Sequence, residues 1–332
     1  MSAPQPGRLM AAESDEALGI FARSALQNVD ASALSEVRAI YTVARGSSDA
    51  AANILSYEFM RELCIPVTSL PPSIFSLGTG VQMQDAAALV ISQSGASDDL
   101  KGTARGAKEA GGTVVAITNQ PDSPVERLAD LTVPIGAGPE LAVPATKSVI
   151  GSLAAGMALL SAVKPEYGAV TERAVTELNG LSARHPEAQA IQSAFLRARH
   201  VYVIGRDTGY GAAQEVALKL KECCAIHAEA YSSSEVLHGP LQLATNPLLV
   251  LMLDTGAPFI QASLDQAEAR FREVDCEVIR VAPTDFGLQA LAPPAAAALL
   301  LAALYPIILN TALALGLDPD APETLAKVTR TT

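Results

Sequence analysis

Residues 39–46 read AIYTVARG, and residues 200–206, about 160 positions later, read HVYVIGR. Each stretch is a short apolar run that ends in a glycine turn, as buried strands of a parallel sheet do. A similar spacing relates two further pairs of apolar runs, those at 89–94 and 248–254 and those at 113–117 and 276–281. An internal repeat of this kind is stronger evidence for a fold than any one strand prediction. The repeat therefore predicts two α/β domains of one fold.

Strands alternate with helical segments in each repeat, which is the pattern of a doubly wound, flavodoxin-like parallel sheet. His185 and Pro186 mark a break in the connection between the repeats. The sequence accordingly divides into a helical lead-in (1–37), a first domain (38–170), a second domain (190–316) and a C-terminal tail (317–332). We expect two tandem domains, each with its own core.

The composition is that of an acidic globular protein. Hydrophobic residues make up 49% of the 332 residues, and the net charge of −12 argues against nucleic acid or an anionic membrane surface as the main partner. An apolar run at 294–317 is long enough to cross a membrane, but Pro306 and Asn310 interrupt it. We expect a core helix there and another at 149–163. The N-terminus lacks the apolar core of a secretory signal, and the four cysteines show no metal-ligand spacing. These features favour a cytoplasmic protein with mostly buried, free thiols.

A turn rich in hydroxyl groups follows one strand of the first repeat. Residues 92–97 read SQSGAS and lie between a buried strand and a helix. Free backbone amides and the helix dipole favour an anion at a helix N-terminus, and serine hydroxyls add hydrogen bonds. The predicted phosphate site consists of the serines at this turn and of two serines after the neighbouring strand, namely Ser92, Ser94, Ser97, Ser47 and Ser48. The alternative is that Ser97 or Asp98 only caps the helix.

The corresponding turn of the second repeat differs in its chemistry. Residues 254–256 read DTG, so Asp254 stands where the first repeat has serines. We expect that turn to hold no phosphate. Neither turn has the G-x-x-x-x-G-K-[ST] pattern of a nucleotide-binding loop.

The stretch 215–243, EVALKLKECCAIHAEAYSSSEVLHGPLQL, carries acid and base groups. Helical spacing places Glu215, Lys219 and Glu222 on one helix face. The helical pattern ends after Ala225, and His238 precedes a Gly-Pro pair that cannot continue a helix, so we expect His238 on a loop. Two carboxylates, an ammonium group and an imidazole are the groups of general acid–base catalysis. The alternative is a solvated helix face followed by an ordinary loop histidine.

These motifs resemble the double sugar isomerase (SIS) domain family. Within that family the sequence is most similar to the isomerase half of glutamine–fructose-6-phosphate aminotransferase and to the SIS-type glucosamine-6-phosphate deaminases. The resemblance runs from about residue 38 to the C-terminus, and three motifs carry it: SQSG at 92–95, ALKLKE…HAEAYSSSE…HGPL within 217–241, and DPDAPETLAKVT at 318–329. Two turns depart from the aminotransferase, which has CGTS where this chain has RGSS at 45–48 and VASTK where it has VPATK at 143–147.

The resemblance implies how a substrate would be held. The phosphate ligands would be Ser92, Gln93, Ser94 and Ser97, and the residues near the sugar would be Ser47, Ser48 and Val143. Lys327 in the tail would close over the site. In this family the site often lies at a dimer interface with the histidine donated by the partner, so the resemblance also implies a homodimer with a shared active site.

The resemblance further implies the chemistry. Glu222 would move the proton between C1 and C2 of a phosphosugar, His238 would help to open the ring, and Lys219 would assist at the sugar oxygens. No metal, nucleotide or flavin cofactor is implied. Because the chain shows no glutaminase domain, we expect an isomerising deaminase that converts glucosamine 6-phosphate to fructose 6-phosphate and ammonia. The alternatives are an aldose–ketose phosphosugar isomerase without deamination and a non-catalytic phosphosugar sensor.

Overall fold

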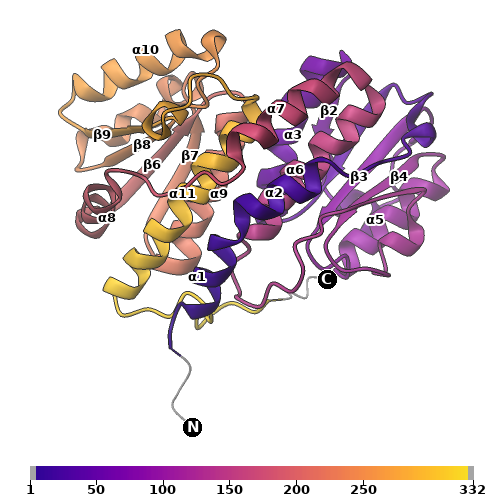
Figure 1. Cartoon of the computed structure of the whole chain (residues 1–332), viewed down its shortest axis with the longest axis horizontal. Coiled ribbons are helices and arrows are strands. Elements are labelled where there is room, and N and C mark those ends of the chain that lie inside the picture. The colour runs from indigo at the N-terminus through magenta and orange to yellow at the C-terminus, as the bar shows by residue number, and fades with distance from the viewer. Residues whose placement is uncertain (1–4, 328–332) are drawn as a thin grey trace. The chain divides into compact units, whose positions relative to one another are not determined.

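The computed structural model of the protein describes residues 5–327, which form two compact units (Figure 1). The β1–β5 unit comprises residues 19–140 and 147–179. The β6–β9 unit comprises residues 5–18, 141–146 and 180–327. Residues 5–18 of the lead-in and the segment 141–146 thus belong to the same unit as the second sheet, whereas residues 19–37 belong to the unit of the first sheet.

The β1–β5 unit contains a parallel sheet of five strands in the order β2-β1-β3-β4-β5. Its strands are β1 (Ala39–Val43), β2 (Val67–Ser69), β3 (Ala86–Ser92), β4 (Thr113–Thr118) and β5 (Leu131–Pro134). Its helices are α2 (Ala17–Ala25, whose first two residues belong to the other unit), α3 (Ser47–Leu63), α4 (Ser73–Ser76), α5 (Asp98–Glu109), α6 (Lys147–Val163) and α7 (Gly168–Leu178). Central strand β3 is buried at every position, as its continuous apolar run predicts.

The β6–β9 unit repeats this topology with four parallel strands in the order β7-β6-β8-β9. Its strands are β6 (His200–Gly205), β7 (His227–Ser232), β8 (Leu249–Leu253) and β9 (Glu277–Val281). Its helices are α1 (Arg8–Asp15), α8 (Ala188–Arg197), α9 (Thr208–Cys224), α10 (Gln261–Arg272) and α11 (Pro293–Ala314). Helix α10 lies on one face of the sheet, and α9 and α11 pack together on the other (Figure 1). The predicted pair of parallel-sheet α/β domains is confirmed, with β6, β8 and β9 at the places of β1, β3 and β4.

Strand β7 is the element that the sequence pattern does not reveal. The helical pattern does end where expected, because Ala225 adopts a left-handed conformation (φ 52°) at the C-terminus of α9. The chain then enters β7, where only Ala228 is fully buried. A strand that lies at the edge of a sheet and is half exposed has neither a continuous apolar run nor a clear alternation.

Helix α11 is the long apolar segment near the C-terminus. It is long and apolar enough to cross a membrane, but 83% of its most apolar window is buried inside the structure. Pro306 lies within the helix without ending it. The prediction that this segment is a core helix is therefore confirmed, and the same holds for the predicted helix at 149–163, which lies within α6 and is largely buried.

Candidate functional site

The predicted phosphate turn joins β3 to α5. The backbone N–H of Gly95 donates to Ser92 Oγ at 3.0 Å, and that of Ala96 donates to Ser94 Oγ at 3.3 Å. Gly95 has a φ of +58°, and a Cβ atom there would lie 2.3 Å from Ser123 Oγ. Only glycine fits this position, and the tight turn that it permits gathers the serines at the N-terminus of α5.

Ser97 lies at the start of α5, where the sequence allows either a phosphate ligand or a simple helix cap. Ser97 occupies the N-cap position of α5 with extended backbone angles, but its side chain forms no capping hydrogen bond. Asp98 instead pairs with Lys101 one turn along the helix. Ser97 is therefore the N-cap residue of α5, but its hydroxyl makes no bond to the helix amides, and its role as a phosphate ligand stays a prediction.

Ser47 and Ser48 lie at the adjacent strand, at the same edge of the sheet. Helix α3 begins at Ser47, so both serines lie in its first turn after Gly46 (φ 55°). Because β1 pairs directly with β3 in parallel register, the turns after the two strands leave the sheet side by side. The structure therefore brings together the predicted phosphate residues and the two serines predicted near the sugar.

Arg45 links these two turns. Its Nε donates to Asp99 Oδ2 at 2.9 Å, while Asp99 Oδ1 accepts from the Leu100 N–H at 2.9 Å. The Arg45 side chain is 55% exposed, whereas Asp99 is buried. The Arg45 guanidinium group thus compensates the charge of the buried Asp99 carboxylate beside the predicted phosphate site. Arg45 is the residue that stands where the aminotransferase has the cysteine of its CGTS turn.

Replacing Arg45 with methionine is expected to weaken binding of fructose 6-phosphate about tenfold, because the uncompensated Asp99 carboxylate then repels the phosphate. Isothermal titration calorimetry measures this, with Arg105→Met as the control, since Arg105 is an exposed cation on α5, the helix that carries Asp99. Equal weakening in both variants, or none in Arg45→Met, would contradict the assignment.

The second set of candidate residues lies on α9. Lys219 Nζ is 2.6 Å from Glu222 Oε2 and 3.4 Å from Glu215 Oε1. The Lys219 and Glu215 side chains are fully buried, and that of Glu222 is 24% exposed. The alternative of a solvated helix face is therefore wrong for this part of α9.

The charge of Lys219 follows from its surroundings. Burial by itself lowers the pKa of Lys219, but the Glu215 and Glu222 carboxylates outweigh it and hold the pKa above its ordinary value. Lys219 is consequently an ammonium group that fixes the Glu222 carboxylate in place. Tyr305 on α11 donates from its hydroxyl to Glu215 Oε1 at 3.2 Å. This hydrogen bond holds the Glu215 carboxylate, which is the second carboxylate beside Lys219.

The neighbouring thiols are chemically inert. Burial raises the pKa of both Cys223 and Cys224 to about 12, so each is a neutral thiol rather than a nucleophile. All four cysteines are free, as expected. The expected burial holds for Cys223 and Cys224, whereas Cys276 is partly buried and Cys64 is exposed.

His238 ends a short 3-10 turn (Glu235–His238) rather than lying in an irregular loop. Gly239 follows with a φ of 140°, which few other residues adopt and which separates this turn from the next. The imidazole is exposed, and within residues 5–327 it forms no hydrogen bond. His238 is thus accessible to a ligand, as the sequence predicts.

Val143 and the tail lie together in the β6–β9 unit. The Val143 N–H donates to the Asp320 carbonyl at 3.0 Å. The Asp320 carboxylate accepts from the N–H groups of Leu9 and Met10, at 2.8 Å each, and thereby caps the N-terminus of α1. These contacts hold the tail that leads to Lys327, which is half buried at the end of the described chain.

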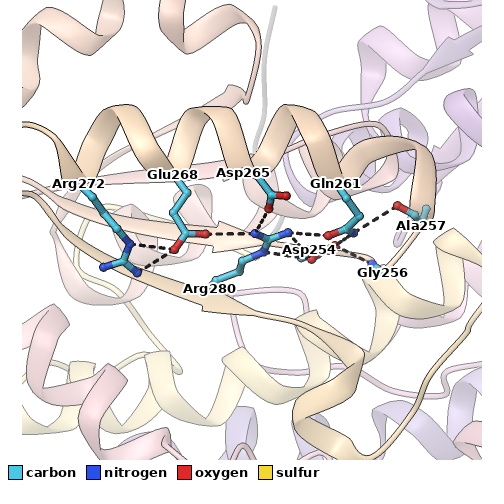
Figure 2. Close-up of polar contacts among 8 residues, drawn as sticks. All are labelled: Asp254, Gly256, Ala257, Gln261, Asp265, Glu268, Arg272 and Arg280. Atoms are coloured by element: carbon cyan, nitrogen blue, oxygen red, sulfur yellow. Dashed lines mark hydrogen bonds and ion pairs between the residues drawn. The ribbon is translucent and has the colours of Figure 1, made fainter.

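The turn after β8 carries a charged network in place of serines (Figure 2). Asp254 Oδ1 accepts from the Gly256 N–H at 2.8 Å, as Ser92 Oγ accepts from Gly95 in the first unit. The Arg280 guanidinium group of β9 donates to four side chains around it, those of Asp254, Gln261, Asp265 and Glu268. In the place of Ser92 the second turn therefore has a carboxylate, which is already bound to Arg280. It lacks the serine hydroxyls that the first turn could offer to a phosphate.

The predicted site residues therefore fall into two sets. The phosphate and serine set lies in the β1–β5 unit, and the set on α9, at His238, at Val143 and in the tail lies in the β6–β9 unit. That both sets bind one substrate stays a prediction. Sequence reasoning missed Tyr305 as a partner of Glu215, because the two residues are 90 positions apart and no local pattern connects them.

Together, the fold and these residues define a tandem parallel-sheet α/β protein with a serine-rich turn between β3 and α5. The chain belongs to the SIS domain family, whose model matches residues 33–162 and 194–297. Each matched segment contains one of the two sheets.

Curated relatives include glutamine–fructose-6-phosphate aminotransferases. The enzyme of Zymomonas mobilis is 29% identical over 321 residues, which cover 89% of this chain and 52% of the relative. That of Mycobacterium tuberculosis H37Rv is 30% identical over an alignment of 350 residues, and the alignment covers 96% of this chain and 55% of the relative. The chain thus spans about half the length of these relatives.

Solved structures extend the likeness over nearly the whole chain. A protein of Silicibacter pomeroyi DSS-3 described as a phosphosugar isomerase is 31% identical with a TM-score of 0.81, over 94% of this chain and 99% of that one. Glucosamine-6-phosphate deaminase of Thermotoga maritima is 20% identical with a TM-score of 0.74, over 98% and 99% of the two chains, and shares the fold.

Proposed function

We propose that the protein is an isomerising deaminase that converts glucosamine 6-phosphate and water to fructose 6-phosphate and ammonia. The observation that carries this proposal is the buried, charged Lys219, which lies 2.6 Å from a partly exposed Glu222. A carboxylate held in one orientation by a permanent cation is suited to take up a proton and deliver it to a neighbouring carbon. Burial of a lysine is costly and is unnecessary for phosphate binding alone.

The proposed reaction begins with binding and ring opening. Ser92, Ser94 and Ser97 hold the phosphate with the amides of their turn, and Arg45 offsets the nearby Asp99 charge. His238 transfers the proton that opens the pyranose ring and leaves an aldehyde at C1 and an amine at C2. Val143 and Lys327 contact the open-chain sugar.

Proton transfer and loss of ammonia complete the reaction. Glu222 removes the proton from C2 and delivers it to C1, while a proton passes from the C2 nitrogen to the C1 oxygen, which converts the C1 aldehyde and C2 amine to a C1 alcohol and a C2 imine. Water then adds to the C2 imine and expels ammonia, which leaves the C2 ketone of fructose 6-phosphate. Lys219 stays protonated throughout and stabilises the Glu222 carboxylate before and after each transfer.

A second candidate is an aldose–ketose phosphosugar isomerase without deamination. The 31% identity to the Silicibacter pomeroyi protein described as a phosphosugar isomerase favours it, and the same residues would serve. A phosphosugar sensor is supported less well, because it needs the serine turn but not the buried Lys219 beside Glu222.

The purified protein incubated with glucosamine 6-phosphate, without glutamine, tests the proposal. We expect ammonia and fructose 6-phosphate in equal amounts, measured by coupled enzymatic assays, with N-acetylglucosamine 6-phosphate and glucose 6-phosphate as controls. Conversion of glucose 6-phosphate to fructose 6-phosphate without release of ammonia from the aminosugar would establish the isomerase instead. Binding without any product would establish the sensor.

The proposal includes a cytoplasmic homodimer whose shared site takes His238 from the partner, with neither nucleic acid nor membrane as a partner. The family resemblance and the net charge of −12 support these points. Light scattering on the purified protein measures the oligomeric state, and a monomer that is fully active would exclude the shared site.

A further inference from the structure

A pair of histidines begins two neighbouring strands of the β6–β9 unit. His200 is the first residue of β6 and His227 the first of β7, and the two are direct partners in the parallel register. Both are exposed and line a cavity of about 870 Å³ at the amino ends of the strands. None of the candidate residues Lys219, Glu222 or His238 lines this cavity.

The two imidazoles face each other through the same kind of atom. His200 Nδ1 and His227 Nδ1 are 3.3 Å apart, with the ring planes at 86°. Two nitrogen ligands of a tetrahedral zinc ion, each bonded at about 2.0–2.1 Å, lie about 3.3 Å apart. The observed separation therefore matches two ligands of one metal ion, and the strand register places the two residues side by side before any ion binds.

Without a metal ion the two rings form a hydrogen bond. At 3.3 Å one Nδ1–H donates to the other Nδ1, at the long end of the distance range for an N–H donor. A metal ion would take the place of that proton, because both Nδ1 lone pairs are available once each neutral ring carries its proton on Nε2.

The surroundings determine which ion fits and how firmly it binds. Within the described chain no third histidine, cysteine or carboxylate completes the site, so water or another donor would fill the remaining positions. The carboxylates of Asp275 and Glu277 line the cavity, but Glu277 pairs with Arg197 at 3.0 Å, and Arg199 adds a positive charge. Binding should accordingly be reversible. Imidazole ligands select Cu²⁺, Ni²⁺ and Zn²⁺ over Mg²⁺ and Ca²⁺.

We propose that His200 and His227 form an exchangeable binding site for a divalent transition-metal ion of the Zn²⁺, Ni²⁺ or Cu²⁺ type. The site is independent of the proposed deaminase reaction. It would be one bound ion per chain, held by the two Nδ1 atoms at the amino edge of the second sheet.

Calorimetric titration of the untagged protein with Ni²⁺, Zn²⁺ and Cu²⁺ tests the site, in a Cys64→Ser background that removes the exposed thiol. We expect one ion per chain, with Cu²⁺ bound most tightly and Mg²⁺ not bound. His200→Gln or His227→Gln should each weaken binding about a hundredfold. The metal ion is then held by one imidazole only, and the advantage of two ligands on the same molecule is lost.

The chain has only two other histidines, His185 and His238, which provides the control. His238→Gln should leave the affinity unchanged, and copper bound to the unmodified pair should show coupling to two nitrogens by electron paramagnetic resonance. Circular dichroism melts of each variant verify folding. Unchanged affinity in the His200→Gln/His227→Gln double variant, or no binding by the Cys64→Ser protein at millimolar metal, would overturn the proposal.

Discussion

Glu222→Gln is expected to lower kcat for glucosamine 6-phosphate about a thousandfold and to leave the affinity for fructose 6-phosphate unchanged. Glutamine has the size of glutamate, and its amide oxygen can still accept a hydrogen bond from Lys219 Nζ, now 2.6 Å from Glu222. It cannot take up a proton from C2, however. Only the transfer step should fail, because the proposed phosphate ligands are serines of the other unit.

The coupled assay for ammonia gives kcat, and calorimetry with fructose 6-phosphate gives the affinity. Glu235→Gln is the matched control, since Glu235 is an exposed carboxylate in the same unit. A Glu222→Gln protein that turns over at the normal rate would remove Glu222 from the mechanism. One that has lost phosphosugar affinity as well would show that Glu222 binds the substrate rather than moving its proton.

The architecture could be predicted because it depends on local apolar runs that recur. Strand β3 (Ala86–Ser92) contains the predicted buried strand before the serine turn, since a strand buried on both faces has a continuous apolar sequence. Strand β7 could not be predicted, because His227 to Ser232 lie at a half-exposed sheet edge and are mostly small or polar. The recurring pattern thus identifies β6, β8 and β9 of the second sheet and misses β7.

The candidate site was predictable in composition but not in burial. The spacing of Glu215, Lys219 and Glu222 places them on one helix face, but it does not tell a solvated face from a buried one. Helix α11 decides this, because it covers α9 and contributes Tyr305 from 90 positions away. The link between Arg45 and Asp99 is similarly a tertiary contact between two turns, and neither turn predicts it alone.

Lys219→Met is expected to destabilise the β6–β9 unit by about 3–5 kcal/mol, because it leaves the buried Glu215 carboxylate without its cation. A thermal melt followed by circular dichroism should show the loss as a shift of roughly 10 °C. Lys221→Met is the matched control on the same helix, where the side chain is exposed and the change should stay within about 0.5 kcal/mol.

The pH dependence of this loss has a definite sign. The pKa of Lys219 is raised above its ordinary value of 10.5, so its stabilising contribution is complete below that pH and is lost only as the pH rises through the folded-state pKa. The difference between wild type and Lys219→Met should therefore persist from about pH 6 to about pH 9. A difference that disappears within this range would show that Lys219 is neutral in the folded protein.

A second substitution separates the charge from the packing. In the double variant Glu215→Gln/Lys219→Met the buried carboxylate is replaced by an amide that can still accept from the Tyr305 hydroxyl, now 3.2 Å from Glu215. The fully buried carboxylate at position 215 is then gone, and only the partly exposed Glu222 has lost its cation, so we expect this variant to melt above Lys219→Met. It should still lack normal turnover, because nothing then holds the Glu222 carboxylate. A double variant that is no more stable than Lys219→Met would mean that the lysine stem, rather than its charge, supports the packing of α9 against α11.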